Sequence, residues 1–437
     1  MGRVAELRAP VIMAEFDLSS PGHIRVLSPA PASKASVFVR AHGEPIGTVY
    51  VEVRGGALDV AVVRTKVVDE LSMDVRRTMG VDLATDSGWL EAAKPTHFAR
   101  MHAAYVSMPE RIAVLLCTRE RPEALKRCLE SLVKQDHSNF SVWVVDNAPK
   151  TPVTREVVKA FRDRLDIKYI EANRPGLSRA RNVALAADID ANIVAWIDDD
   201  EIADSLWLSE ISRSFAQRPD AAAVSGLVLP AELLTMPQVW FEQYGGHSKG
   251  RGYTPTEFSP ATRHIQHPLF PLPLFGSGAN MAFRISALRE MGGFDEALGA
   301  GTLTMGAEDT KMFSELLMSG ATLLYRPSAI TRHFHRRDEA ALERQMTGYG
   351  VGLTAFYTAL VISHPSYLWP LARLVRQGIR ELASLGGDRE ATIGPEFPRS
   401  YLDAHRQALL RGPGWYVRQR WINARERRGS KVSCDRG

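Results

Sequence analysis

Short apolar runs alternate with amphipathic segments in the part of the chain that follows residue 110. The apolar runs have the length of buried strands and occupy residues 112–117, 141–145, 167–170 and 193–197. The segments between them repeat apolar residues with a helical period and occupy residues 123–134, 153–161 and 178–187. This alternation predicts βαβ units, in which a mostly parallel, Rossmann-like sheet carries helices on both faces.

The first 105 residues show another pattern and predict a separate small α+β domain at residues 1–105. Residues 35–41 and 48–53 are rich in β-branched and apolar side chains, and a turn-prone His-Gly-Glu-Pro sequence lies between them. These two segments therefore predict a hairpin. A helical pattern follows at residues 58–79, and we find no catalytic constellation in this domain.

The chain beyond residue 345 predicts a helical extension with a basic tail at residues 346–437. Residues 346–372 contain no Asp, Glu, Lys or Arg and are long enough to span a bilayer. Glycine, proline and hydroxyl side chains interrupt this stretch, which favours buried or interfacial helices. Residues 415–428 interleave aromatic side chains with arginines, a pattern typical of helices on anionic lipid surfaces and also of a solvated terminal helix. Peripheral membrane contact through this region therefore stays open.

Composition narrows the class of protein. With 437 residues, 45% of them hydrophobic and 24% charged, the chain has the composition of a soluble globular protein. A formal charge of +4 gives no indication of a nucleic-acid partner. The three cysteines show no metal-binding spacing, and the first residues lack an apolar core of signal-peptide length. We expect a cytoplasmic protein, with attachment at the inner face of the membrane as an open option.

Polar side chains follow three of the predicted strands at the point where each strand ends. They lie at residues 118–121, 146–147 and 198–201. In parallel sheets the carboxyl ends of the strands meet at one edge, where ligands bind. A single such cluster is ordinary loop composition, but three at one edge predict a ligand site.

The last of these clusters holds four consecutive acidic side chains, Asp198, Asp199, Asp200 and Glu201. Like charges at the end of a buried strand repel each other unless a cation or ordered donors compensate them. Mg²⁺ and Mn²⁺ take such oxygen ligands and leave room for substrate phosphates. The alternative is that these acids cap a helix beginning near Ala203. Three consecutive aspartates fit a metal–phosphate site better than they fit a cap.

Six stretches between residues 111 and 334 resemble, in order and spacing, the family-2 glycosyltransferases, which have the nucleotide-sugar-binding GT-A fold. They read VLLCTRERPEALKRCLESL, VWVVDNA, NRPGLSRARNVAL, VAWIDDDE, GSGANMAFRISALREMGGFDE and GAEDTKMFSELLMSG. The resemblance covers roughly half of the chain and implies a GT-A glycosyltransferase domain at residues 108–345. It also implies an inverting reaction that uses Mg²⁺ or Mn²⁺.

The resemblance assigns roles to residues of the predicted ligand edge. It implies a nucleotide-sugar donor held by Thr118, Arg119, Arg121, Asp146, Asn147, Arg174, Arg181, Asn182, Asp198 and Asp199. Backbone N–H groups and guanidinium groups near a helix start suit the diphosphate of such a donor. Taken alone, residues 118–121 are a polar loop and residues 146–147 a capping turn.

The metal would bind the Asp-x-Asp signature that Asp198 and Asp200 provide, and would neutralise the leaving diphosphate. Related enzymes often close the metal site with a downstream histidine, and His333 or His335 fits this position. The two alternate along the chain, so both face one side of an extended segment. An unspecialised surface histidine is the alternative, and the neighbouring arginines could instead clamp the diphosphate.

Glu308 and Asp309 open a predicted helix at residues 309–318. Acids in a first helical turn are favoured by about 0.3–1 kcal/mol each, so a simple capping role is an alternative. The resemblance is more specific, because it places a Glu-Asp pair after a Gly-Gly-Phe-Asp turn, found here at residues 292–295. It implies that Asp309 is the general base that deprotonates the acceptor hydroxyl and that Glu308 orients the acceptor.

The donor stays open among UDP-, GDP- and dTDP-linked sugars, and the acceptor between a saccharide and a lipid-linked glycan, as in cell-wall or polysaccharide biosynthesis. The Gln-x-x-Arg-Trp motif of processive synthases is absent, which favours single transfer. The alternatives to a glycosyltransferase are a sugar nucleotidyltransferase and a binding scaffold. A sugar nucleotidyltransferase would need a glycine-rich loop after the first strand, which the chain lacks. A sugar-nucleotide-binding scaffold without chemistry would not need the intact acids.

Overall fold

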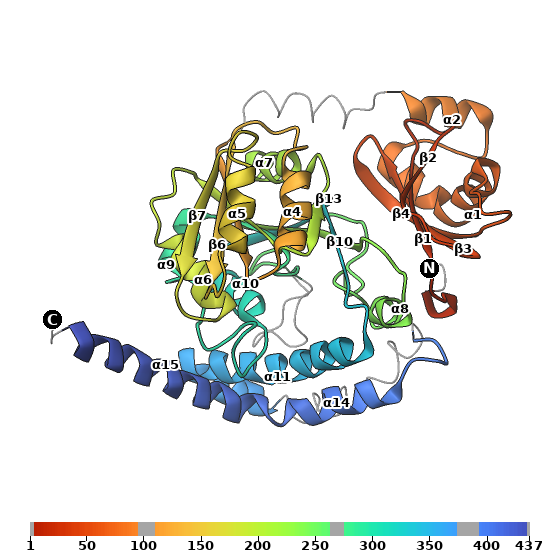
Figure 1. Cartoon of the computed structure of the whole chain (residues 1–437). Helices are drawn as coiled ribbons and strands as arrows, with labels where there is room; N and C mark the ends of the chain where they lie inside the picture. The colour runs from red at the N-terminus through yellow and green to blue at the C-terminus, as the bar shows by residue number, and fades with distance from the viewer. Residues whose placement is uncertain (1–3, 95–109, 263–274, 374–392, 435–437) are drawn as a thin grey trace.

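The computed structural model describes residues 4–94, 110–262, 275–373 and 393–434. Three parts follow one another along the chain (Figure 1): a small N-terminal unit in red and orange, a large α/β body from yellow to cyan, and a layer of long helices in blue. The expected α/β fold with added N- and C-terminal parts is therefore confirmed.

The N-terminal unit pairs a four-stranded sheet with helices. After the short 3₁₀ helix η1 (Val4–Glu6), its strands are β1 (Ile12–Asp17), β2 (Ile24–Ser28), β3 (Lys34–Ala41) and β4 (Glu44–Glu52), in the order β2-β1-β3-β4. Strands β3 and β4 pair antiparallel, which confirms the expected hairpin. Its helices are α1 (Val60–Met79) and α2 (Asp86–Ala93).

Helix α1 lies where the sequence pattern places it. It begins where the Asp59 carboxylate accepts a hydrogen bond from the Ala61 amide, and it ends at Gly80, whose φ of 71° suits glycine. Its buried residues recur at a spacing of four and pack on the sheet: Val63, Val67, Leu71 and Val75.

The α/β body is built on a nine-stranded sheet with the order β11-β13-β10-β12-β8-β5-β6-β7, and β9 pairs with β13 off this path. Its strands are β5 (Ile112–Thr118), β6 (Phe140–Asn147), β7 (Ile167–Ala172), β8 (Ile193–Ile197), β9 (Glu201–Ala203), β10 (Ala221–Pro230), β11 (Thr256–Phe258), β12 (Asn280–Arg284) and β13 (Thr322–His333). Pairs β5–β6, β6–β7, β5–β8 and β10–β13 are parallel. Strands β9, β11 and β12 run against their partners, so most strands share one direction.

Helices cover both faces of this sheet, as the sequence pattern predicts. One face carries α4 (Pro122–Leu132), α5 (Val153–Ala160) and α7 (Trp207–Gln217). The other carries α6 (Leu177–Leu185), α9 (Ile285–Glu290) and α10 (Glu308–Met318). Successive β5 residues alternate between the two cores, with Val114 in the first and Leu115 in the second. The hydrophobic effect holds the layers together. It contributes about 25 cal/mol for each Å² of apolar surface that the two faces remove from water.

One expectation about this sheet is wrong. The helix expected to begin near Ala203 begins only at Trp207, and Glu201–Ala203 forms the short strand β9 against β13. The Asp200 carbonyl accepts a hydrogen bond from the Phe334 amide at 2.9 Å. The four acids therefore lead into a strand, and a helix-capping role for them is excluded.

The C-terminal part forms a layer of helices under the α/β body (Figure 1). It contains α11 (Glu339–Ser363), the 3₁₀ helix η2 (Pro365–Tyr367), α14 (Arg399–Leu409) and α15 (Gly412–Cys434), and it borders α8 (Met236–Gln243) of the body. Within the described ranges, α11 alone has the length and apolar composition of a membrane-spanning helix, and half of its most apolar window is buried inside the protein. This burial agrees with the expectation of a buried or interfacial helix.

Buried ion pairs join the N-terminal unit to the α/β body. Arg40 on β3 donates to Asp204, just after β9, at 2.7 Å, and Arg332 on β13 donates to Glu15 on β1 at 2.8 Å. All four side chains are 10% exposed or less. Burial opposes ionisation of Asp204, but Arg40 outweighs it and lowers the pKa of that carboxyl. The N-terminal unit is thus fixed against β9 and the end of β13.

Arg40→Ala should lower the free energy of unfolding by about 3–5 kcal/mol, because it leaves Asp204 buried without its partner. Arg25→Ala is the matched control: Arg25 also contacts Glu15, at 3.0 Å, but it is 58% exposed. The control should cost about 0–1 kcal/mol. Denaturant unfolding of both variants measures the difference. Equal losses in the free energy of unfolding would contradict a stabilising role of the Arg40–Asp204 pair.

Candidate active site

A cavity of about 1880 Å³ opens at the edge of the sheet where the predicted polar clusters meet. Loops after β5, β6 and β8 supply one side, and the start of α10 and the end of β13 supply another. Of the residues expected from the sequence, eleven line this cavity: Thr118, Arg119, Arg121, Asn147, Arg181, Asp198, Asp199, Asp200, Glu308, Asp309 and His333. The triple aspartate and the Glu-Asp pair therefore share one space.

The three aspartates have different partners. Asp199 is buried and accepts hydrogen bonds from the Thr118 hydroxyl at 2.7 Å and from Arg121. Asp200 is buried, accepts from Arg121 at 2.9 Å, and lies 3.3 Å from the Nε2 atom of His333. Asp198 is 35% exposed toward the cavity, and its carboxylate lies 3.9 Å from Arg181. Asp199 and Asp200 are thus held by protein side chains, whereas Asp198 is partly exposed to the cavity.

Charge in this cluster is incompletely compensated. Burial raises the pKa of Asp198 to about 7 and that of Asp199 to about 6, against the opposing effects of Arg181 and Arg121. Burial also opposes ionisation of Asp200, but His333 and Arg121 outweigh it and hold its pKa well below the usual range. Burial raises the pKa of Glu201 well above its ordinary value. Such a cluster favours a bound cation.

Glu308 and Asp309 occupy the first turn of α10, after Ala307 in the left-handed conformation with φ 71°. The Asp309 carboxylate accepts hydrogen bonds from the Gly278 amide at 2.6 Å and from the Thr310 amide at 2.7 Å, and it borders the cavity. A Cβ atom at Gly278 would come within 3.0 Å of this carboxylate, so glycine allows the close approach. Asp309 is therefore fixed but still reachable from the cavity.

Arg181 connects the two acidic groups. Its guanidinium donates to Glu308 at 2.9 Å and to the Gly278 carbonyl at 3.1 Å, and it is 1% exposed. Burial raises the pKa of Glu308, with Arg181 acting in the opposite direction. Glu308 is thus engaged by Arg181 inside the protein.

Three expected donor-binding residues do not line the cavity. Asp146 is buried and accepts from the Tyr169 hydroxyl at 2.8 Å. The Asn182 side chain bonds both the carbonyl and the amide of Phe294, each at 2.8 Å. Arg174 is exposed. Asn147, next to Asp146, does line the cavity, and its Oδ1 atom has no hydrogen-bond partner among the described residues.

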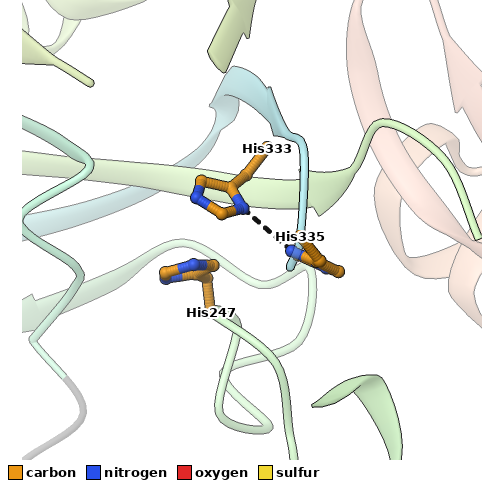
Figure 2. A group of neighbouring side chains, drawn as sticks. All are labelled: His247, His333 and His335. Carbon is orange, nitrogen blue, oxygen red and sulfur yellow. Dashed lines mark hydrogen bonds between the residues drawn. The ribbon is translucent and has the colours of Figure 1, made fainter. Parts of the chain in front are cut away.

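The two expected histidines differ in position. His333 borders the cavity and faces Asp200, whereas His335 is buried behind it and contacts Glu242 at 2.8 Å. Figure 2 shows a third ring, His247, beside this pair, and the three histidines could offer one ligand atom each within 4.8 Å of one another. His247 was missed from the sequence, because it lies in a loop far from the other two along the chain.

Arg251 is a second residue that the sequence reading missed. It lines the cavity, donates to the His247 carbonyl, and its Nε and Nη1 atoms are buried without a partner in the described part of the chain. Burial lowers its pKa. Unpaired guanidinium nitrogens at a cavity wall suit an anionic ligand. Its only sequence signal is its place in a glycine-rich loop.

The sequence also matches known proteins. Residues 113–292 match the sequence model of the family described as glycosyl transferase family 2. A pre-mycofactocin glycosyltransferase from Mycobacterium tuberculosis is 25% identical over 74% of this chain and 62% of its own length. A glucosyl-dolichyl phosphate glucuronosyltransferase from Haloferax volcanii is 25% identical over 43% of this chain and 57% of its own. The chain thus spans about three-fifths of the length of these relatives.

A solved structure of a mannosyltransferase from Pyrobaculum calidifontis, in complex with GDP-Man and Mn²⁺, aligns with a TM-score of 0.46 at 16% identity and covers 72% of this chain and 95% of that one. The family assignment depends on the sequence matches and on the motifs assembled around the cavity. The match of residues 113–292 supports a family-2 glycosyltransferase domain in this chain.

Arg181→Met should lower the free energy of unfolding by about 3–5 kcal/mol, because it leaves Glu308 buried without its cation. Arg174→Met serves as the comparison: Arg174 is exposed, so its replacement should change stability by at most about 0.5 kcal/mol. Denaturant unfolding of both variants gives the values. If Arg181→Met were as stable as the wild type, Arg181 would not compensate the charge of Glu308.

Proposed function

We propose that this protein is a metal-dependent, inverting glycosyltransferase that moves a sugar from a nucleoside diphosphate to an acceptor hydroxyl. The observation that carries the proposal is the shared cavity, in which the triple aspartate and Asp309 face one space. Arg181 joins the two groups through Glu308 and lies near Asp198. A donor diphosphate at the first group would present its sugar to the second.

The residues present fit a divalent cation. Asp200 and His333 place an oxygen and a nitrogen 3.3 Å apart at the cavity wall, and Asp198 adds a half-buried carboxylate whose pKa burial raises to about 7. These three side chains would hold Mg²⁺ or Mn²⁺, with His335 behind them. When bound, the ion would neutralise the charge that develops on the departing diphosphate.

Asp309 is the proposed general base. Two amide donors hold its carboxylate, and the remaining lone pairs can take the proton of an acceptor hydroxyl. The hydroxyl oxygen then forms the new bond to the anomeric carbon while the bond to the diphosphate breaks on the opposite side. Arg251 and Arg336 line the cavity and would bind the phosphates. Asn147 can bind polar atoms of the nucleoside, and the base stays open among uracil, guanine and thymine.

Asp309→Asn should reduce transfer by about 10²–10⁴-fold, because an amide cannot accept the acceptor proton. Thermal shifts by nucleotide sugars in the presence of Mn²⁺ should stay as in the wild type. The control is Glu315→Gln on the same helix, whose carboxylate pairs with Lys311. Release of nucleoside diphosphate measures transfer. Wild-type transfer by Asp309→Asn would contradict its role as the general base. Donor binding without any transfer in the wild type would instead indicate a binding scaffold.

The acceptor is the less defined substrate. Beyond Asp309 the cavity is lined by apolar side chains of α11 and its neighbours: Leu353, Phe356, Val361, Ile362, Leu368, Leu371 and Leu409. Ile362 and Leu368 are 42% and 54% exposed, so part of this apolar lining is open to solvent. A saccharide would not need this surface, whereas an acceptor with an apolar tail would cover it. We therefore favour a lipid-linked acceptor.

A dodecyl glycoside should bind at least about tenfold more tightly than the methyl glycoside of the same sugar, because each buried CH₂ contributes about 0.8 kcal/mol. Leu353→Asn should remove this preference without affecting the thermal shift by nucleotide sugars. Calorimetric titration of both glycosides into wild type and variant provides the comparison. Equal affinities for the two glycosides in the wild type would favour a water-soluble saccharide.

A further inference from the structure

The exposed tryptophans of the protein lie in its C-terminal helical layer. All eight tryptophans belong to the described residues, and six of them are buried or half-buried. Trp369, just after η2, is 74% exposed, and Trp421 on α15 is 57% exposed. Leu410, between α14 and α15, is 87% exposed. Single exposed apolar residues are ordinary, so their arrangement decides whether they form a docking surface.

Two of these residues lie directly beside the mouth of the active-site cavity. Leu368 and Leu409, which precede Trp369 and Leu410 in the sequence, both line the cavity. Pro413, in the first turn of α15, lines it as well. The apolar lining that the acceptor would cover therefore continues outward to Trp369 and Leu410, and α15 begins at the same place.

Helix α15 carries different side chains on its two faces. The face toward the α/β body is buried and carries Tyr416, Gln419 and Asn423. The Asn423 amide donates to the Glu296 carbonyl at 3.0 Å. The opposite face is exposed and carries Val417, Arg418, Trp421 and Arg425. Figure 1 shows α14 and α15 as the outer helices of the layer, beyond α11. Trp421 therefore faces away from the protein, among arginines.

Positive charge dominates this part of the surface. Seven arginines and two acids lie between residues 399 and 427. Each acid has a basic partner, since Asp403 lies 3.5 Å from a neighbouring arginine and Glu426 lies 2.7 Å from Arg179. Arg418 and Arg425 are exposed and form no ion pair with the described part of the chain. A second copy of this chain would bring the same arginines together, which like-charge repulsion opposes.

We propose that the outer face of α15, together with Trp369 and Leu410, docks on the surface of an anionic phospholipid bilayer. Indole rings settle at the level of the lipid headgroups, and arginines attract the phosphates there. The mouth of the cavity would then open toward the bilayer. This orientation rests on the lipid-linked acceptor proposed above, whose tail could enter the cavity without crossing water. The contact with lipid does not rest on the transferase function.

Co-sedimentation of the full-length protein with vesicles tests the charge of the partner. Vesicles of equal parts phosphatidylcholine and phosphatidylglycerol should bind the protein, and vesicles of phosphatidylcholine alone should not. Arg418→Gln/Arg425→Gln should weaken binding at least about tenfold, because each arginine near an anionic surface adds to the attraction. The control is Arg162→Gln/Arg289→Gln, which removes two exposed arginines of the α/β body and should bind as the wild type does.

Three results of this experiment would overturn the proposal. The first is a wild type that does not bind the anionic vesicles. The second is equal binding to both kinds of vesicle, which would exclude recognition of anionic lipid. The third is an equal loss in the two double variants, because binding would then follow net charge instead of the outer face of α15.

Leu410→Ser tests the apolar contribution. Burying a leucine side chain in the bilayer is favourable, so this variant should weaken vesicle binding about tenfold. Leu90→Ser is the matched control, because Leu90 is 70% exposed on α2 of the N-terminal unit. It should leave binding unchanged. Unchanged binding in Leu410→Ser would remove this residue from the docking surface and contradict the proposal.

Quenching by brominated phospholipids identifies the face that meets the bilayer. Bromine atoms on the acyl chains quench only tryptophans that enter the lipid, and Trp369 and Trp421 are the exposed ones. Wild-type fluorescence should fall on brominated vesicles, and Trp369→Phe/Trp421→Phe should remove most of this loss. Quenching that persists in the double variant would overturn the proposed face. Quenching that Trp369→Phe leaves unchanged would overturn the orientation of the cavity toward the bilayer.

These measurements use neither donor nor acceptor nor metal, so they are independent of the transferase function. A wild type that binds the vesicles but transfers no sugar would contradict the proposed function and leave the lipid contact standing. Analytical ultracentrifugation without lipid tests the other occupant. A dimer that Trp421→Ala dissociates, in a protein that binds no vesicles, would assign this face to a second copy of the chain and overturn the proposal.

Discussion

The rest of the structure depends on how four consecutive acids at the end of β8 are compensated. Each belongs to a different environment, although the four are adjacent in sequence. Asp199 accepts hydrogen bonds from Thr118 and Arg121, and Asp200 accepts one from Arg121 and lies 3.3 Å from the Nε2 atom of His333. Asp198 stays exposed to the cavity with a raised pKa, so the cluster as a whole retains a demand for positive charge. Under the proposed function, that demand defines where a cation and a diphosphate would fit.

The same constraint explains how distant parts of the chain converge. Strand β9 follows the acids directly and pairs with the end of β13, which carries His333. The N-terminal unit holds this pair from outside, through Arg40 to Asp204 and Glu15 to Arg332. Helix α8 supplies Glu242 from the other side. The N-terminal unit is therefore built into the support of the acidic cluster, which the sequence of residues 1–105 alone does not reveal.

Agreement between sequence and structure is best where the pattern is local. The alternating strands and helices from residue 112 to residue 197 lie at the expected places, because their apolar periodicity is set by burial on a sheet or on one helix face. The helix expected near Ala203 failed for a non-local reason. Pairing with β13 gives Glu201–Ala203 backbone partners that a helix would have to replace. The local sequence around Ala203 does not reveal this pairing, because β9 and β13 are far apart along the chain.

The sequence by itself determined the α/β class, the family resemblance and the cluster of acids at the ends of strands, since these follow from residue order and period. Only the tertiary structure decided which side chains meet. It brought His247 and Arg251 to the cavity from a loop with no motif, and it turned Asn182 toward the Phe294 backbone. It also placed His333 at the cavity wall and His335 behind it, although the two lie two residues apart in sequence. The physical reason is that partners of a buried polar group come from other elements, and their distance in space is unrelated to their separation along the chain.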